Sequence, residues 1–310
     1  MKLYGALEAG GTKMVLAAVN EKGEILDRIS IPTRTPEQTM PEMIGYFREK
    51  QVCAMGIGCF GPLDLNTRSE TYGNITATPK LAWRNYPILS AFSEALCVPV
   101  GMDTDVNGAA LAESVLGAAR GLESCLYITV GTGIGGGAVI HGKPVHGLTH
   151  PEIGHIPIRP MESDPMMRGV CPYHSCCPEG MASGPAIEKR WGISAKELPT
   201  EHPAWELEAY YLAQVCACAM LSFSPEKIIM GGGVMQKKFL FPMIRDKTLA
   251  LLNGYVTHPV IDSGLGDYIV EPGLGTESGI LGAYLLAKQA YGEKQASGGH
   301  TVREGDGAAG

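Results

Sequence analysis

Hydrophobic residues along the chain form short runs separated by polar or glycine-rich turns. The first runs lie at residues 2–9 and 14–19, on either side of the turn "GGTK", and a third lies at residues 24–31. Short apolar runs joined by glycine turns are typical of antiparallel strands. We therefore expect the chain to open with a β-hairpin followed by a third strand.

The same order of elements begins again at Cys125. There the run "CLYITV" is followed by "GTGIGGG", then by "AVI" and a turn at "HGK". In P-loop and dinucleotide-binding motifs the glycines lead from a strand into a helix, whereas here they lead into another strand. This context disfavours a Rossmann interpretation and predicts two α/β domains, each beginning with a glycine-bent hairpin.

Longer periodic segments predict helices between and after these hairpins. An Ala-rich helix is expected at Val106–Ala119, after a strand at residues 98–102, and a strongly apolar helix at residues 202–224. The run "EKIIMGGGV" predicts a strand, a glycine turn and a helix, and a closing helix is expected near residues 277–290. The polar, glycine-rich segment 291–310 is expected to be disordered.

The length of 310 residues allows two α/β domains with separate cores. We expect an N-terminal domain over residues 1–118 and a C-terminal domain over residues 119–290, with the closing helix packing back onto the first. The net charge of −7 argues against a nucleic-acid partner, which needs a surplus of Lys and Arg. No signal peptide and no membrane-spanning run is recognisable, so we expect a cytoplasmic protein whose nine cysteines are reduced.

Two glycine bends and one acidic turn are candidates for phosphate chemistry. Gly10, Gly11 and Thr12 offer backbone N–H groups and a hydroxyl to a phosphate, and Lys13 could add charge; the alternative is an ordinary hairpin turn. The bend "GTGIGGG" could act in the same way in the second domain. In "DTDVN", between a strand and a helix, Thr104 or Asp105 could be a helix cap; alternatively, one of the carboxylates of Asp103 and Asp105 could be a general base.

A cluster of cysteines and a histidine follows in "GVCPYHSCCPEG". In a reducing compartment such a cluster favours a metal over a disulfide. The nearest upstream histidine is His155. Together with Cys171, His174 and Cys177 it would form a tetrahedral Cys₂His₂ zinc site. Using Cys176 in place of His155 would give a Cys₃His site, and a third possibility is a set of unliganded surface thiols.

Several motifs, taken in order, resemble the ROK family of sugar kinases and repressors, most closely its bacterial fructokinase branch. They are "EAGGTK", "GCFGPLD", "GNITATPKLAW", "DTDVNGAALAE", "TVGTGIGGG", "HPEIGHIPI", "CPYHSCCPEGMASGPAIE", "IIMGGGVM" and "GLGTESGILGA". The resemblance extends from Tyr4 to about Ala287. It implies a duplicated actin-like/hexokinase-type fold of the ribonuclease H-like class, with two α/β domains closing on ATP and a sugar at an active site in the interdomain cleft.

The resemblance also implies roles for individual residues. Asp105 falls on the catalytic base. The ATP-binding positions of the family correspond to Gly10, Gly11, Thr12, Lys13, Thr132, Gly133, Gly184, Pro185, Gly231, Gly232 and Gly233. The sugar-binding positions of the family correspond to Asn74, Thr76, Asp105, Glu152, His155 and Glu179. The zinc ligands of the family fall on His155, Cys171, His174 and Cys177, which implies a structural zinc, while Mg²⁺ accompanies ATP.

The implied activity is ATP-dependent phosphorylation of a hexose at its C6 hydroxyl, from fructose to fructose 6-phosphate and ADP, by a homodimer. Many relatives have Asp in place of Glu8, and many glucokinase-like members have Asn in place of Thr104; both differences match the fructokinase branch and favour fructose. One alternative is a kinase for glucose, mannose or an N-acetylhexosamine, and another is a non-catalytic sugar-sensing member. Repressors of the family carry a helix-turn-helix before the first phosphate loop, for which this sequence leaves no room, because "EAGGTK" begins at residue 8.

Overall fold

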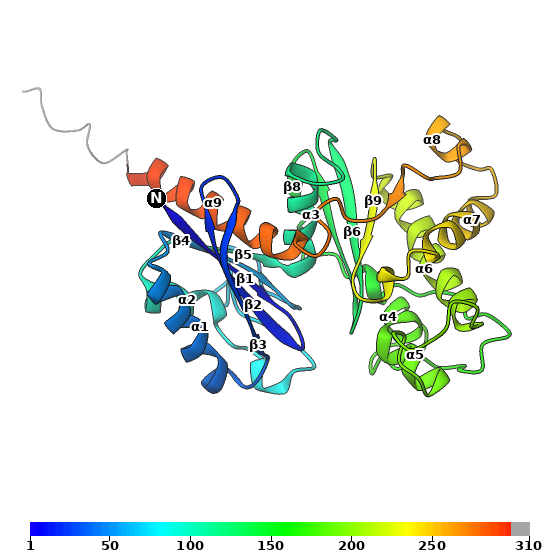
Figure 1. Ribbon diagram of the computed structural model, residues 1–310, viewed down its shortest axis with the longest axis horizontal. Helices are drawn as coiled ribbons and strands as arrows, with labels where there is room; N and C mark the ends of the chain where they lie inside the picture. The colour runs from blue at the N-terminus through cyan, green and yellow to red at the C-terminus, as the bar shows by residue number, and fades with distance from the viewer. Residues whose placement is uncertain (299–310) are drawn as a thin grey trace, which may run out of the picture. The chain divides into compact units, whose positions relative to one another are not determined.

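The computed structural model describes residues 1–298, with side chains described to residue 296 (Figure 1). Residue contacts divide the chain into two compact units. Among the described residues, unit 1 comprises Met1–Gly108 and the segment from Gly279 to Gly298, and unit 2 comprises Ala109–Ser278. The boundary lies ten residues before the one expected after residue 118, because helix α3 (Asp105–Val115) passes from one unit into the other.

The sheet of unit 1 has five strands in the order β3-β2-β1-β4-β5. Strands β1 (Leu3–Ala9), β2 (Lys13–Asn20) and β3 (Ile25–Pro32) are antiparallel neighbours, as the hydrophobic pattern predicts. Strand β4 (Ala54–Cys59) runs parallel to β1, and β5 (Val100–Thr104) runs parallel to β4. The carboxyl ends of β1, β4 and β5 therefore lie along one edge of the sheet.

Both faces of this sheet are covered by helices (Figure 1). Helices α1 (Pro36–Lys50) and α2 (Ile88–Leu96) pack on one face, and α9 (Ser278–Gly298) packs on the other. A Cβ added to Gly56 of β4 would lie 1.8 Å from the carbonyl oxygen of Ala283, so only glycine allows α9 to approach the sheet this closely. The closing helix thus belongs to the N-terminal unit.

Helix α9 is longer than the sequence suggested. It continues to Gly298, so residues 291–298 are helical where a disordered tail was expected. Within the helix, Tyr291 packs against the same core as Tyr284 and makes an edge-on ring contact with Tyr4 at 5.8 Å. These aromatic contacts explain why the helix extends past residue 290. The remainder of the expected tail, residues 299–310, lies outside the described residues.

The sheet of unit 2 repeats the topology of the first, with the order β10-β9-β6-β7-β8. Its strands are β6 (Ser124–Val130), β7 (Ile134–Ile140), β8 (Lys143–Pro144), β9 (Ile228–Gly231) and β10 (Ile269–Val270). The first three are antiparallel, and β9 and β10 continue the sheet in parallel from β6. The repeated architecture that the two glycine-bent hairpins predicted is therefore present.

The helices of unit 2 pack mainly on one side of this sheet and enclose its principal core. They are α4 (Pro178–Ala182), α5 (Gly184–Trp191), α6 (Ala204–Phe223), α7 (Leu240–Leu252) and α8 (Pro259–Asp262). Short 3₁₀ turns occur at η1 (Leu81–Trp83) in unit 1 and at η2 (Ile153–His155) and η3 (Val234–Gln236) in unit 2. Within residues 1–298, no helix combines the length and the apolar character that crossing a membrane requires.

Helix α3 ends at Val115, four residues before the predicted end at Ala119. The reason is a tertiary contact of the buried Glu113. Its carboxylate accepts a hydrogen bond from Ala118 N at 2.7 Å and others from Gly273 N at 3.0 Å and Ser278 Oγ at 2.6 Å. The Glu113 carboxylate thus binds the backbone that follows the helix and connects it to residues 273–278.

Candidate active site

The first glycine bend joins β1 to β2 and is fixed by backbone contacts. Gly10 N donates to Lys13 O at 3.0 Å, while Thr33 donates from its hydroxyl to Gly10 O and from its backbone N to Thr12 O. Within residues 1–298, the N–H groups of Gly11 and Thr12 have no protein acceptor. The bend is thus held in shape by its carbonyl groups and presents two N–H groups, a combination that suits an anion.

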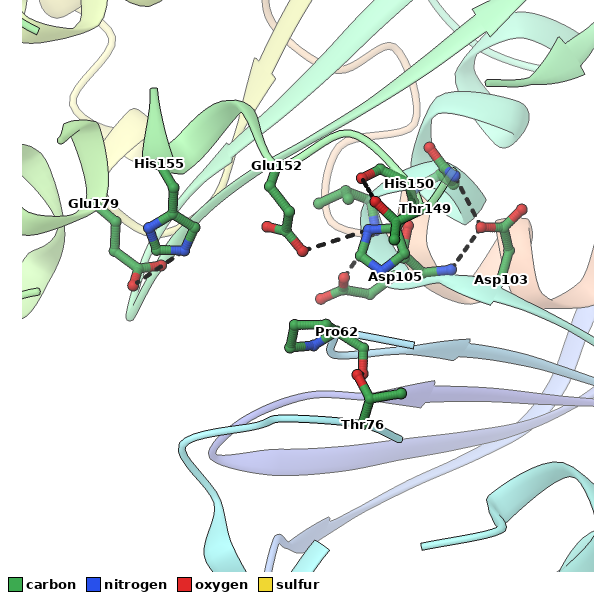
Figure 2. A network of polar contacts seen from close by, with 12 residues as sticks. Pro62, Thr76, Asp103, Asp105, Thr149, His150, Glu152, His155 and Glu179 are labelled. Atoms are coloured by element: carbon green, nitrogen blue, oxygen red, sulfur yellow. Dashed lines mark hydrogen bonds and ion pairs between the residues drawn. The ribbon is translucent and has the colours of Figure 1, made fainter. Parts of the chain in front are cut away.

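The start of α3 separates the two aspartates of "DTDVN". Asp103 is buried, and its Oδ1 accepts hydrogen bonds from Thr104 N at 2.7 Å and from Asn107 Nδ2 at 2.8 Å (Figure 2). The Thr104 hydroxyl accepts from Asn107 N at 3.1 Å and so provides the helix cap. Asp105 is only partly buried and its Oδ1 accepts from Val106 N at 2.9 Å. The capping role therefore falls to Thr104, and the helix does not need the Asp105 carboxylate for it.

The predicted sugar segment of unit 1 is pinned to the loop after β4. Thr76 donates to Pro62 O from its backbone N at 2.8 Å and from its hydroxyl at 3.0 Å. Asn74 O accepts from Asp64 N at 3.0 Å. Because the Thr76 proton is used by Pro62, its hydroxyl oxygen remains as a hydrogen-bond acceptor for a ligand.

In unit 2 the structure brings the four predicted metal ligands together. The ligand atoms of His155, Cys171, His174 and Cys177 all lie within 4.8 Å of one another. The Cys171 sulfur is 3.5 Å from His174 Nδ1 and 3.8 Å from His155 Nδ1, and the Cys177 sulfur is also 3.8 Å from His155 Nδ1. Cys176 is not a member of this group and packs instead against the core of unit 2.

The chemistry of this donor set fits zinc. Two thiols and two imidazoles are the ligands of a closed tetrahedral zinc site. Burial is the main factor that raises the pKa of the Cys177 thiol to about 12, while a hydrogen bond from Gly180 N opposes the rise. A buried thiol with such a pKa does not ionise near neutral pH without a compensating cation, which is what a bound metal would provide.

The two ring nitrogens of His155 face different partners. Nδ1 faces the thiols, whereas Nε2 lies 3.8 Å from Glu179 Oε1 (Figure 2). The other oxygen of Glu179 accepts a hydrogen bond from Ile134 N at 3.1 Å. An added Cβ on Gly133 would lie 2.6 Å from that oxygen, so the glycine leaves room for the carboxylate. Glu179 thus connects the metal-ligand group to the second glycine bend.

Glu152 lies beside a buried histidine. Its Oε1 is 3.4 Å from His150 Nδ1, as Figure 2 shows. Burial and, to a lesser degree, the Glu179 carboxylate raise the pKa of Glu152 to about 7. Because 43 % of the Glu152 side chain remains exposed, water screens part of this effect. A carboxyl group near its pKa at neutral pH can both donate and accept hydrogen bonds.

The ATP-binding residues predicted in unit 2 gather around Gly131. Gly131 N donates to Gly133 O at 2.9 Å, and Gly184 N, at the start of α5, donates to Gly131 O at 2.8 Å. A Cβ added to Gly131 would lie 3.9 Å from Gly233 N. Gly232 has a φ of +93°, which favours glycine. The bend "GTG", the start of α5 and the turn after β9 are therefore neighbours.

A buried ion pair beside the loop of the predicted metal ligands could not be recognised from the sequence. Asp164 and Arg190 are both buried, with Arg190 Nε 2.8 Å from Asp164 Oδ1, and Tyr211 donates to Asp164 Oδ2 at 2.5 Å. Arg190 also donates to Met181 O at 2.8 Å. The ion pair thus joins the segment before Cys171 to the segment after Cys177. The hydrophilic context "MESDP" is typical of a surface loop and gives no signal for burial.

A comparison with known protein families finds a match over nearly the whole chain. Residues 4–290 match the ROK family. The chain belongs to this family. It is 50% identical over 296 residues to a putative fructokinase from Bacillus subtilis strain 168, covering 96% of this chain and 99% of that protein. It is 45% identical to a fructokinase from Pediococcus pentosaceus, covering 93% of this chain and 98% of that protein.

Among solved structures, this ROK protein is similar to a ROK family glucokinase from Streptomyces griseus in complex with glucose and AMPPNP. The TM-score is 0.75 at 26% identity, and the match covers 93% of this chain and 99% of that one. The expected two-domain α/β fold of a ROK sugar kinase is thereby confirmed. The roles of the individual site residues stay predictions.

Proposed function

We propose that this ROK protein is an ATP-dependent fructokinase that converts fructose to fructose 6-phosphate. The observation that carries the proposal is its similarity, over nearly the full length, to two proteins bearing the fructokinase name. Two glycine bends and a carboxylate that the helix cap does not need are consistent with phosphoryl transfer.

In the proposed reaction Asp105 accepts the proton of the C6 hydroxyl as O6 attacks the γ-phosphorus of ATP. A bond forms between O6 and phosphorus, the bond to the β,γ-bridging oxygen breaks, and ADP leaves with that electron pair. The N–H groups of Gly11 and Thr12, and the bend containing Thr132 and Gly133, would bind phosphate oxygens. Mg²⁺ bound with ATP would neutralise part of the phosphate charge.

The residues proposed to bind the sugar are Asn74 and Thr76 in unit 1 and Glu152, His155 and Glu179 in unit 2. The substrates of the proposed reaction are this sugar and ATP. Excluding water from these substrates would prevent transfer of the phosphoryl group to water.

We further propose that His155, Cys171, His174 and Cys177 bind a structural zinc ion. With all four positions filled by protein, the metal takes no part in phosphoryl transfer. It would instead fix the orientation and the tautomer of His155, whose Nε2 then faces Glu179 and the sugar. The predicted homodimer and the cytoplasmic location are part of the same proposal.

The main alternative is a kinase for another hexose, favoured by the structural similarity to a glucokinase. Steady-state phosphorylation of fructose, glucose, mannose, N-acetylglucosamine and N-acetylmannosamine with MgATP separates these possibilities. We expect fructose to have the highest kcat/KM. Another hexose with a kcat/KM about tenfold above that of fructose would replace the fructokinase assignment.

A further inference from the structure

Lys80 lies directly beside the first glycine bend. A Cβ added to Gly11 would lie 3.2 Å from Lys80 Cε and 3.8 Å from its Nζ, so the end of this side chain borders the bend. Lys80 comes from the segment "TPKLAW", far from the bend in sequence. The fold thus adds a cation to a loop that otherwise presents neutral N–H groups.

The backbone of Lys80 is anchored on both sides. Its N donates to the Thr78 hydroxyl at 3.3 Å, and its carbonyl accepts from Trp83 N at 2.8 Å. Trp83 is itself buried and donates from its indole nitrogen to Arg34 O at 2.7 Å. The ammonium lies 6.0 Å from the centre of the Phe60 ring. These contacts hold the backbone from which the Lys80 side chain extends towards Gly11.

The groups around the Lys80 ammonium would favour a bound anion. The side chain is half-buried, yet within residues 1–298 no carboxylate lies within 4 Å of its ammonium. The N–H groups of Gly11 and Thr12, next to it, also have no protein acceptor within the same residues. A positive charge beside two open N–H groups is a binding site for a phosphate.

The register of the sheet indicates which phosphate of ATP would lie beside Lys80. Ala9 pairs with Cys59, and Cys59 pairs with Thr104, so the residues that follow each strand end lie at one edge. Those residues are Gly10, which begins the first bend, Phe60, whose ring lies near the Lys80 ammonium, and Asp105, the candidate base. In the proposed reaction Asp105 accepts the proton of the attacking C6 hydroxyl, so the γ-phosphoryl group is the ATP phosphate nearest to Asp105.

We infer that Lys80 is a substrate-binding residue whose ammonium contacts the γ-phosphate of ATP and stabilises its charge during transfer. This inference rests on the proposed kinase function. Because charge on the transferred group is what the ammonium would stabilise, Lys80 contributes to the chemical step as well as to ATP binding. Lys13, at the exposed start of β2, belongs to the same bend but has no comparable contact with Gly11.

Lys80→Met tests the inference, with Lys22→Met in the exposed β2–β3 turn as the matched control. We expect Lys80→Met to lower kcat/KM for ATP by about 10²-fold or more and to weaken binding of AMPPNP while leaving ADP binding close to that of the wild type. Lys22→Met should leave all three values unchanged. Lys80→Arg should recover part of the activity, because it restores the charge.

Two results would overturn the inference. One is Lys80→Met with wild-type AMPPNP affinity and turnover. The other is equal loss of ADP and AMPPNP binding together with a lower melting temperature, which would assign Lys80 a structural role. Wild-type protein that phosphorylates no hexose would refute the kinase proposal instead, and the comparison of the two nucleotides in Lys80→Met would still report on phosphate contact.

Discussion

Asp103 and Asp105 are two residues apart, but their surroundings give them different tasks. Asp103 is buried and bonded to Thr104 and Asn107, so its carboxylate stabilises the start of α3. Asp105 occupies the first helical position and is partly exposed. From the sequence alone either Thr104 or Asp105 could have been the cap. The observed cap on Thr104 favours Asp105 as the catalytic base.

Asp105→Asn is expected to lower kcat by about 10²- to 10⁴-fold, because the amide cannot accept the proton of the sugar hydroxyl. The melting temperature should stay close to that of the wild type, since Thr104 retains the cap. Steady-state kinetics and thermal unfolding measure both effects. Asp103→Asn is the control and should show the opposite pattern, with lower stability and a smaller loss of turnover. An Asp105→Asn enzyme that keeps most of its turnover would show that another group is the base.

At the scale of single elements, α6 contains a buried acid without a complete set of partners. Glu208 is buried, and its Oε1 has no hydrogen-bond partner in the described part of the chain. Burial raises the pKa of Glu208 well above its usual range, and only the charge of Arg190 opposes the rise. The side chain is therefore neutral in the folded protein under conditions in which it would be ionised in the unfolded chain.

Glu208→Gln should consequently change the pH dependence of stability. Between the unfolded pKa of Glu208 and its raised folded pKa, the folded state binds the extra proton, so wild-type stability falls as pH rises. The glutamine of the variant does not titrate, so the variant does not lose stability in this way as pH rises. Its free energy of unfolding relative to that of the wild type should increase by up to about 1.4 kcal/mol per pH unit above pH 5. Denaturant unfolding at pH 5 to 8 measures the difference.

The control for this prediction is Glu206→Gln on the same helix. The Glu206 carboxylate is half-exposed and forms an ion pair with Lys247, which is worth little at a surface. This variant should keep the pH slope of the wild type. If Glu208→Gln also kept that slope, Glu208 would be ionised in the folded protein.

Elements defined by local pattern could be predicted, and those defined by distant contacts could not. The two glycine-bent hairpins follow directly from apolar runs and glycines. The cysteines and histidines close in sequence indicated a candidate metal site, and the structure brings His155, Cys171, His174 and Cys177 together. The end of α3 coincides with hydrogen bonds between Glu113 and residues 273–278, and the continuation of α9 past residue 290 coincides with the contact of Tyr291 with Tyr4. Lys80 and Asp164 gave no signal, because their partners lie far away in the sequence.

Across the whole molecule, one strand order is used twice, and the two copies differ in what is added to them. In unit 2 the addition is the segment between β8 and α5, which contains the metal-ligand group. From this group a series of contacts leads through His155 Nε2 to Glu179, and from Glu179 to Ile134 N beside the second glycine bend. A change at the metal ligands should therefore reach the proposed sugar and phosphate contacts.

Removal of zinc should lower both stability and sugar affinity. Because the metal would join His155 to Cys171, His174 and Cys177, metal-stripped protein should melt about 5 °C or more below the zinc-bound protein. His155 would then lose its fixed orientation, and KM for fructose should rise about tenfold or more. Chelation followed by calorimetry, zinc analysis and fructose kinetics measures these effects. Cys177→Ser should behave like the stripped protein, whereas Cys176→Ser, its immediate neighbour, should retain zinc, melting temperature and KM. An undiminished melting temperature after complete removal of zinc would contradict the structural role, because a closed site that stabilises the fold cannot lose its metal without cost.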